Sequence, residues 1–295
     1  MIKSGRSPRD KSERMILNNY HAMNFIRENR DQRLTPNFVI ELHRLVTDGT
    51  LERPNTAGRM QLPGEDRIEV FDRVTGTVLH EPPPAEQLPE RLKGMCEFAN
   101  GKKLETFLHP VVRAIIVHFW LAFDYPFDDG NGRTARALFY WSMLSQGYWL
   151  AEFLTISSIV TRALVQYAKS FLYTETDDND LTYFILYQLR VIISAINELE
   201  GCLQRKMAEV KRTEKLIKQL GTLNYRQTAL LSHAFRYPDH PYTVKSHSLS
   251  HSVVSQTART DLTGLVECGL LEKRKAGKGF VYYPAENISD KLKSG

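Results

Sequence analysis

Long hydrophobic runs are missing from the 295-residue sequence. No stretch of about 18 consecutive apolar residues occurs, so a membrane-spanning helix is not expected. The first residues, MIKSGRSPRDKSER, are charged and no apolar segment follows them, which argues against a secretory signal. These absences predict a cytoplasmic protein without a membrane partner.

Cysteine is scarce, and its spacing does not favour a metal or disulfide framework. The three cysteines are Cys96, Cys202 and Cys268, and no CxxC pair occurs. We interpret them as small buried hydrophobic groups. An excess of one charge is also small, because 39 Lys and Arg against 34 Asp and Glu leave a net charge of +5. This excess permits contact with nucleic acid or nucleotide without establishing it.

What the sequence does contain is mainly helical patterning. Hydrophobic residues make up 42% and charged residues 25%, as in ordinary globular chains. The strongest strand signal before residue 270 is a hairpin with strands at 67–71 and 77–80. Apolar spacing predicts helices at 12–29 (with Ser12 as N-cap), 36–46, 85–100, 110–124, 134–147 and 156–173, and a long one at about 181–220 capped by Asp180. That long helix is typical either of a homodimer or of a link between two domains.

The character of the chain changes after residue 220. Asn224 can cap a helix in YRQTALLSHAFR, and further helices are expected in TVKSHSLSHS and SQTARTDLTGLVECGLL. Two short strands around a Lys-Gly turn follow in LLEKRKAGKGFVYYP. Three helices and a hairpin in this order are typical of a winged helix-turn-helix. The predicted domains are therefore 1–220 and 221–295.

The segment 125–136, YPFDDGNGRTAR, has the pattern of an anion-binding loop. Gly130 and Gly132 allow main-chain N–H groups to turn inward where a new helix begins, so donors and helix dipole converge. Arg133 and Arg136 are three residues apart and can face the same anion. Asp129 is a hard oxygen ligand of the kind Mg²⁺ takes together with substrate phosphates. Several phosphates and one metal indicate a nucleoside triphosphate.

The same letters allow a simpler interpretation. DGNG alone is an ordinary turn, and Phe127 fits a core anchor that locks the loop. The two arginines at a fixed offset after DGNG favour the anion site over the plain turn.

This stretch resembles the signature of the Fic (Fido) family, His-x-Phe-x-(Asp/Glu)-Gly-Asn-Gly-Arg-x-x-Arg. Every fixed position agrees except the first, where this chain has Tyr125. A hairpin at about 58–82 is similar to the family's flap over a target peptide, and TETDDNDLTYF and the tail are similar to a bacterial Fic subgroup. The resemblance implies a mainly α fold, a Fic-type helical bundle with a β-hairpin flap, followed by a small winged-helix α/β domain.

The resemblance also implies roles for the motif residues. Phe127 is expected in the core and Asp129 on Mg²⁺. Family members use the motif histidine to take a proton from a Ser, Thr or Tyr hydroxyl of a target protein, which attacks the α-phosphate of ATP and becomes AMPylated. The positions implied to bind ATP are Gly130, Asn131 and Gly132 for the α and β phosphates, and Arg133 and Arg136 for the outer phosphates.

Tyr125 departs from this mechanism at the position of the base. Histidine titrates at about 6.5 and tyrosine at about 10, so about one phenol per thousand is ionised at pH 7. Arg133 and a metal would have to lower the pKa by about three units, or roughly 4 kcal/mol. His118, seven residues earlier in an apolar helix, is interpreted as a core histidine. We therefore expect a nucleotide-binding Fic fold with weak or absent transfer.

The tail supports a second hypothesis. Polar residues at the start of the predicted recognition helix suit base edges, and a basic wing suits the phosphate backbone. Winged helices also serve in protein docking or dimerisation, and charges on a hairpin are often only solvated. Two functions stay open, an adenylyltransferase and a non-catalytic, nucleotide-responsive DNA-binding regulator. The candidate DNA contacts are Gln256, Thr257, Arg259, Lys273, Arg274, Lys275 and Lys278.

Overall fold

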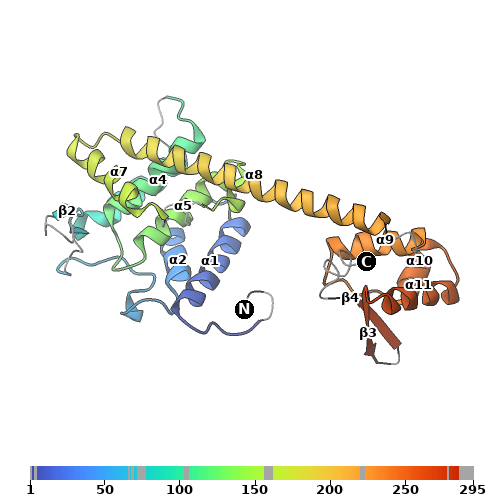
Figure 1. Cartoon of the computed structure of the whole chain (residues 1–295). Coiled ribbons are helices and arrows are strands. Elements are labelled where there is room, and N and C mark those ends of the chain that lie inside the picture. Colours follow the sequence, from blue (N-terminus) through green and yellow to red (C-terminus); the bar gives the residue numbers. More distant parts are fainter. Residues whose placement is uncertain are drawn as a thin grey trace. The chain divides into compact units, whose positions relative to one another are not determined.

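The computed structural model describes the chain except for residues 1, 3–4, 66, 68–69, 72–77, 103–105, 156–161, 220–222, 278 and 286–295. Its described part is mainly helical, with two small antiparallel sheets (Figure 1). None of the helices in these residues combines the length and the apolar character that a bilayer crossing requires.

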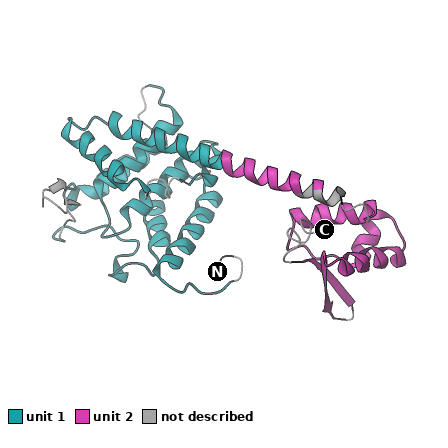
Figure 2. Cartoon of the chain, viewed as in Figure 1, with its two compact units in different colours: residues 1–199 teal, residues 200–295 magenta. Residues whose placement is uncertain are grey.

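The chain forms two compact units, Met1–Leu199 and Glu200–Gly295 (Figure 2). Their boundary falls inside the long helix α8 (Thr182–Gln219), so each unit contains part of this helix. The predicted boundary at residue 220 lies at the far end of the same helix. Leu181, not the predicted Asp180, holds the N-cap position of α8, because its carbonyl accepts from the Ile185 N–H at 2.9 Å. Asp180 lies one residue earlier, and its side chain accepts from the Thr182 N–H at 2.9 Å.

Unit 1 is a helical bundle in which α4 and α5 pack most extensively against each other. Pro110 occupies the first turn of α4, and the apolar character all round this helix places it in the core. The helices before α8 are α1 (Lys11–Glu28), α2 (Pro36–Thr47), α3 (Leu88–Ala99), α4 (Pro110–Asp124), α5 (Asn131–Ser145) and α7 (Leu164–Thr176), with short 3-10 turns η1 (Pro54–Thr56), η2 (Ala85–Gln87) and η3 (Trp149–Phe153).

A small hairpin accompanies the bundle. Strand β1 (Val70–Phe71) pairs antiparallel with β2 (Val78–His80), with Val70 opposite His80. The predicted strands overlap these two, whereas the tip at 72–77 and the start of the predicted helix at 156–173 lie outside the described residues.

Some predicted details are wrong. Asp10, not Ser12, caps α1, because its side chain accepts from the Glu13 N–H at 2.8 Å. Helix α5 begins at Asn131, inside the segment predicted as loop, since Gly130 supplies the positive φ of 88° from which a helix can start. Helix α7 also continues to Thr176, beyond the predicted end at 173.

The cysteine interpretation holds for one residue of three. Cys96 is buried in α3, and burial raises the pKa of its thiol to about 12. Cys202 and Cys268 are exposed, so the prediction that they are buried is wrong. Cys202 lies on a solvent-facing stretch of α8 and Cys268 follows the last residue of α11, where no other element covers them in the described part of the chain.

Unit 2 contains three helices followed by a hairpin, the order expected from the sequence. A capping box joins Asn224 and Gln227 at the start of the first helix. Tyr242 forms an isolated bridge to Tyr282 of the hairpin, which ties the loop before the second helix to the sheet. The elements are α9 (Tyr225–Arg236), α10 (Val244–His251), α11 (Ser255–Glu267), β3 (Leu271–Ala276) and β4 (Gly279–Pro284).

A buried carboxylate connects the three helices of unit 2. Asp261 of α11 is 3% exposed and accepts from Arg226 Nε at 2.6 Å, Asn224 Nδ2 at 2.7 Å and His247 Nε2 at 3.1 Å. Burial alone would raise the pKa of Asp261, but the hydrogen bonds from Arg226, Asn224 and His247 outweigh it and lower the pKa to about 2. The network therefore holds α9 and α10 against α11.

Candidate functional site

The main chain fixes Tyr125 in an unusual conformation between α4 and α5. Its φ of 48° and ψ of 53° are left-handed, and its N–H donates to the Leu121 carbonyl at 3.2 Å. Arg67 donates from Nη1 to the Tyr125 carbonyl at 3.1 Å and from Nη2 to the Asp124 carbonyl at 2.7 Å. These bonds satisfy carbonyls that the end of α4 leaves without helical partners.

Phe127 and Asn131 lock the loop. Phe127 is fully buried and stacks on the His43 ring, with centroids 3.8 Å apart. The Asn131 side chain accepts from the Phe127 N–H at 2.9 Å and donates to the Phe127 carbonyl at 2.7 Å. The Asn131 amide is thus committed to the loop, and this residue offers a ligand only its main-chain N–H.

The start of α5 is left open for an anion. Its N-cap, Gly130, makes no side-chain capping bond. The first N–H groups of a helix have no partner within the helix, so those of Asn131, Gly132 and Arg133 can donate to a ligand, and the helix dipole favours negative charge there.

His43 supports the loop from α2. Its Nδ1 accepts from the Gly58 N–H at 3.0 Å, so Nε2 carries the proton and donates to the Asp129 carbonyl at 2.8 Å. Burial lowers the pKa of His43, which favours this neutral form. Nothing in the local sequence around His43 indicates this role, because its partners lie far along the chain.

Replacing Gly130 by alanine tests how tightly α2 fits against the loop. An added Cβ would lie 2.4 Å from Thr47 Cγ2, at a position with a φ of +88°. We expect Gly130→Ala to lower the free energy of unfolding by about 2–4 kcal/mol, from left-handed strain and overpacking together. Urea unfolding measures it.

Gly147→Ala is the matched control, because its φ is +86° and a Cβ there would meet nothing within 4 Å. Gly147→Ala should lower the free energy of unfolding only by the backbone strain, about 1 kcal/mol. Equal losses in the two variants would show that the contact with Thr47 is not tight.

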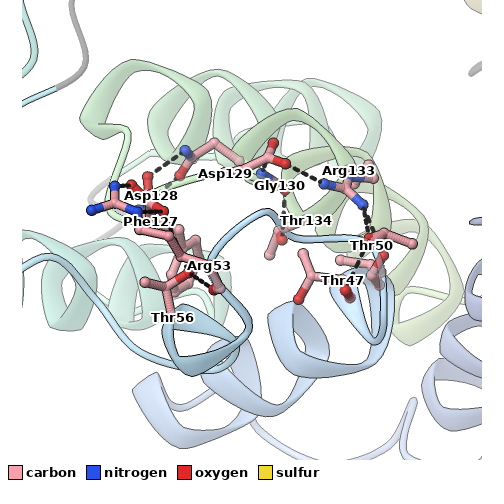
Figure 3. A network of polar contacts seen from close by, with 12 residues as sticks. Thr47, Thr50, Arg53, Thr56, Phe127, Asp128, Asp129, Gly130, Arg133 and Thr134 are labelled. Carbon is pink, nitrogen blue, oxygen red and sulfur yellow. Dashed lines mark hydrogen bonds and ion pairs between the residues drawn. The ribbon is translucent and has the colours of Figure 1, made fainter. Parts of the chain in front are cut away.

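The two successive aspartates have different partners (Figure 3). Asp128 is paired with Arg53, whose Nε lies 3.0 Å from Asp128 Oδ2. Asp129 points toward Arg133, whose Nη2 lies 3.0 Å from Asp129 Oδ2, and 57% of the Asp129 side chain is exposed. Arg133 Nη1 also donates to Thr50 Oγ1 at 2.7 Å. Asp129 is therefore an accessible carboxylate beside the open end of α5.

The two motif arginines line one cavity. This cavity, of about 340 Å³, lies between α1, α5 and η3, and Glu152 and Asn19 also line it. Burial lowers the pKa of Arg136, although a guanidinium stays charged at any ordinary pH. The structure thus brings together two of the residues selected from the sequence, Arg133 and Arg136.

Tyr125 lines a second cavity, of about 230 Å³, with Gly132, Tyr167, His80 and Glu175. Burial raises the pKa of Tyr125, and the charge of Asp129 adds to this effect. The phenol is therefore neutral near pH 7, and the lowering by Arg133 considered from the sequence does not occur.

Sequence analysis missed three polar residues of this second cavity. His80 Nδ1 lies 2.8 Å from Glu175 Oε2, and its Nε2 lies 2.7 Å from the Phe123 carbonyl. Tyr167 contacts His118, whose Nε2 is 3.1 Å from the Tyr167 hydroxyl. These residues come from β2 and α7. His80 lies in the predicted hairpin and Glu175 in the segment TETDDNDLTYF, but neither pattern assigns these side chains to the cavity.

His118 is a core histidine, as expected. It is 1% exposed, and burial lowers its pKa to about 3. A ring held neutral in this way has little affinity for a proton, so His118 is a poor substitute for the missing base.

In unit 2 the candidate DNA contacts lie on α11 and β3. Gln256 and Arg259 are exposed on α11, and Thr257 is half-buried there. On β3, Lys273 is exposed beside the Phe280 ring, 4.0 Å from its centroid, and Arg274 pairs with Glu272. Lys275 is exposed on the same strand, and Lys278 lies outside the described residues.

The fold is that of a helical domain in which a Gly-containing loop leads into the start of α5. Residues 33–143 match the model of the Fic/DOC family, so this part of the chain is a Fic/DOC family domain. The predicted mainly helical Fic fold with a small hairpin is confirmed.

Individual proteins with similar sequences or folds also carry the Fic name. A protein adenylyltransferase Fic of Nematostella vectensis is 31% identical over 119 residues, 40% of this chain and 25% of that protein. Protein adenylyltransferase fic-1 of Caenorhabditis elegans is 29% identical over 153 residues, 50% of this chain and 27% of that protein. The chain thus spans about a quarter of the length of these relatives. A Fic family protein from Desulfovibrio desulfuricans G20 has a similar fold, with a TM-score of 0.53 and 16% identity over 97% of this chain and 79% of that one.

Proposed function

We propose that unit 1 binds ATP with Mg²⁺ at the start of α5 and is an adenylyltransferase-type Fic domain whose transfer to other proteins is weakened by Tyr125. The observation that carries this proposal is that Arg133 and Arg136 line one cavity and belong to the first turns of a helix whose initial N–H groups have no helical partner. Such an arrangement suits a chain of phosphates.

The parts of this site have distinct tasks. The N–H groups of Asn131 and Gly132 would bind the α and β phosphates, while Arg133 and Arg136 would bind the outer ones. Asp129 fits Mg²⁺, because an accessible carboxylate beside bound phosphates is how this ion is usually held, and the ion would neutralise charge on the phosphates. A target protein would present a hydroxyl side chain near the hairpin of β1 and β2.

Tyr125 limits the proton transfer in this scheme. Its half-buried phenol is neutral near pH 7 because burial raises its pKa, so it cannot take a proton from a substrate hydroxyl as an imidazole does. The proposed phosphate-binding residues at the start of α5 do not depend on the side chain at position 125, because main-chain bonds hold that residue in place. Binding without efficient transfer is therefore the expected behaviour toward other proteins.

Calorimetric titration with ATP and Mg²⁺ tests the binding site. We expect Arg133→Ala to weaken ATP binding by about 10- to 100-fold, since a charged hydrogen bond is worth about 1.5–3 kcal/mol. Arg190→Ala, at an exposed position on α8, is the control and should bind like the parent. Absence of ATP binding by the parent chain would refute the proposal.

A second candidate function is DNA binding by unit 2 as a winged helix. This function does not depend on adenylyl transfer by unit 1. Exposed Gln256 and Arg259 on α11 next to the basic strand β3 favour it. Arg259→Ala should weaken binding to duplex DNA and reduce the slope of log K against log salt by about 1 if it contacts phosphate.

Fluorescence anisotropy at several salt concentrations measures this slope. Lys245→Ala, an exposed lysine on α10, is the matched control. Identical behaviour of the two variants would argue against α11 as the DNA-reading helix, and an ATP-dependent affinity would favour the regulator.

A further inference from the structure

Tyr125 lines a cavity that adjoins the start of α5. Its side chain lines the 230 Å³ cavity together with Gly132, which belongs to the open first turn of α5. Its backbone is fixed on both sides, by the bond to Leu121 and by those from Arg67. Tyr125 thus borders the cavity from a backbone held on both sides, which favours a defined approach of its side chain to a bound phosphate.

The length of the side chain matters here. The phenolic oxygen of a tyrosine lies farther from the main chain than the ring nitrogens of a histidine do. A base at position 125 would hold a substrate hydroxyl at hydrogen-bond distance, about 2.6–3.2 Å beyond its nitrogen. A tyrosine at position 125 therefore matches the place of an acceptor hydroxyl better than that of the base.

A proton acceptor lines the same cavity. Glu175 contributes its carboxylate from α7, and His80 bonds to Oε2 of that carboxylate at 2.8 Å. Among the residues that the structure describes, Oε1 has no hydrogen-bond donor. A neutral phenol needs such a base when it attacks, because its own ionisation is disfavoured by burial.

We propose that Tyr125 is itself an adenylylation site, and that its hydroxyl accepts the adenylyl group of the ATP bound in the same chain. This inference rests on the proposed function, because it requires nucleotide at the start of α5. Beyond the proposed function, it identifies the residue that accepts the adenylyl group as a tyrosine of the same chain.

The step balances without an oxidant or reductant. The Tyr125 oxygen forms a bond to the α-phosphorus, and the bond from that phosphorus to the oxygen bridging the β-phosphate breaks. Pyrophosphate leaves with the electron pair, and the phenolic proton passes to Glu175. The product is a phosphodiester between AMP and the phenol, formed once per chain because the acceptor is consumed.

The test incubates the full chain with Mg²⁺ and ATP labelled at the α-phosphate, with no other protein present. We expect one adenylate per chain, located at Tyr125 by fragmentation mass spectrometry of the peptide that contains it. Tyr125→Phe should lose the label while calorimetry shows the same ATP affinity as the parent. Tyr173→Phe, an exposed tyrosine of α7 that is 47% exposed, should label like the parent.

Glu175→Gln separates the proton acceptor from the nucleotide site. It should slow labelling by about 10²-fold, the lower end for losing a positioned base, without changing ATP affinity. Unchanged labelling would show that the proton goes elsewhere and would overturn the assignment of Glu175.

The two proposals fail in different ways. If the parent binds ATP but carries no label at Tyr125, or carries it on another residue, the self-modification is wrong and nucleotide binding stands. If the parent does not bind ATP, both are wrong.

Discussion

Tyr125→His should raise the rate of adenylyl transfer to protein hydroxyls other than residue 125 by about 10²–10⁴-fold, the usual contribution of a positioned general base. The variant replaces a phenol whose pKa is raised by burial with an imidazole that titrates near neutral pH. It also removes the hydroxyl that we propose as the acceptor, so label must appear elsewhere. Incorporation of α-labelled adenylate into protein, followed over time, measures the rate.

The pH dependence identifies the base. Activity of Tyr125→His should rise with pH through about 6.5, as the imidazole loses its proton and becomes able to accept one. Tyr125→Phe provides neither a base nor a hydroxyl and is the matched control. A rate for Tyr125→His no higher than that of Tyr125→Phe would show that proton removal does not limit transfer.

Asp261→Asn should destabilise unit 2 by about 3–5 kcal/mol, because it leaves buried donors facing a neutral amide. The carboxylate is 3% exposed and bonds to Arg226, Asn224 and His247. Native-state hydrogen exchange on the full chain, followed at the amides of α9, α10 and α11, measures the loss. Glu267→Gln, an exposed position near the end of α11, should change little.

Acid should weaken the same network, with a smaller loss than the substitution causes. The folded pKa of Asp261 is lowered to about 2 from an ordinary 3.8, so its stabilisation is present above about pH 4 and is lost as the pH falls toward 2. A difference of nearly two units corresponds to about 2 kcal/mol. Exchange protection in unit 2 that falls equally in the parent and in Asp261→Asn over this range would contradict the assignment.

The sequence predicted the parts of the site that depend on neighbours along the chain. Gly130 permits the turn, and Arg133 and Arg136 reach the same cavity because they are about one helical turn apart. Helix α4 was predictable from Pro110 and its apolar residues. Each of these inferences needs only the spacing within one segment.

Distant contacts could not be predicted in this way. His43 and Arg67 bond to loop carbonyls from α2 and from the segment before β1, and no local pattern predicts these contacts. The same holds for His80 of β2, which lies against the Phe123 carbonyl of α4. The raised pKa of Tyr125 also depends on burial, which the packing of α7 near α4 determines. The exposure of Cys202 could not be predicted either, because composition does not show which face of a helix is covered by other elements.

The left-handed turn at residue 125 has a consequence for how this site can change over generations. Bonds to its N–H and its carbonyl hold the turn, and neither bond involves the side chain. The codons for tyrosine and histidine differ at a single base. A point mutation can therefore exchange the side chain at the proposed nucleotide site while the surrounding main chain stays the same. On the proposed function, catalysis could then be lost or regained while nucleotide binding is kept.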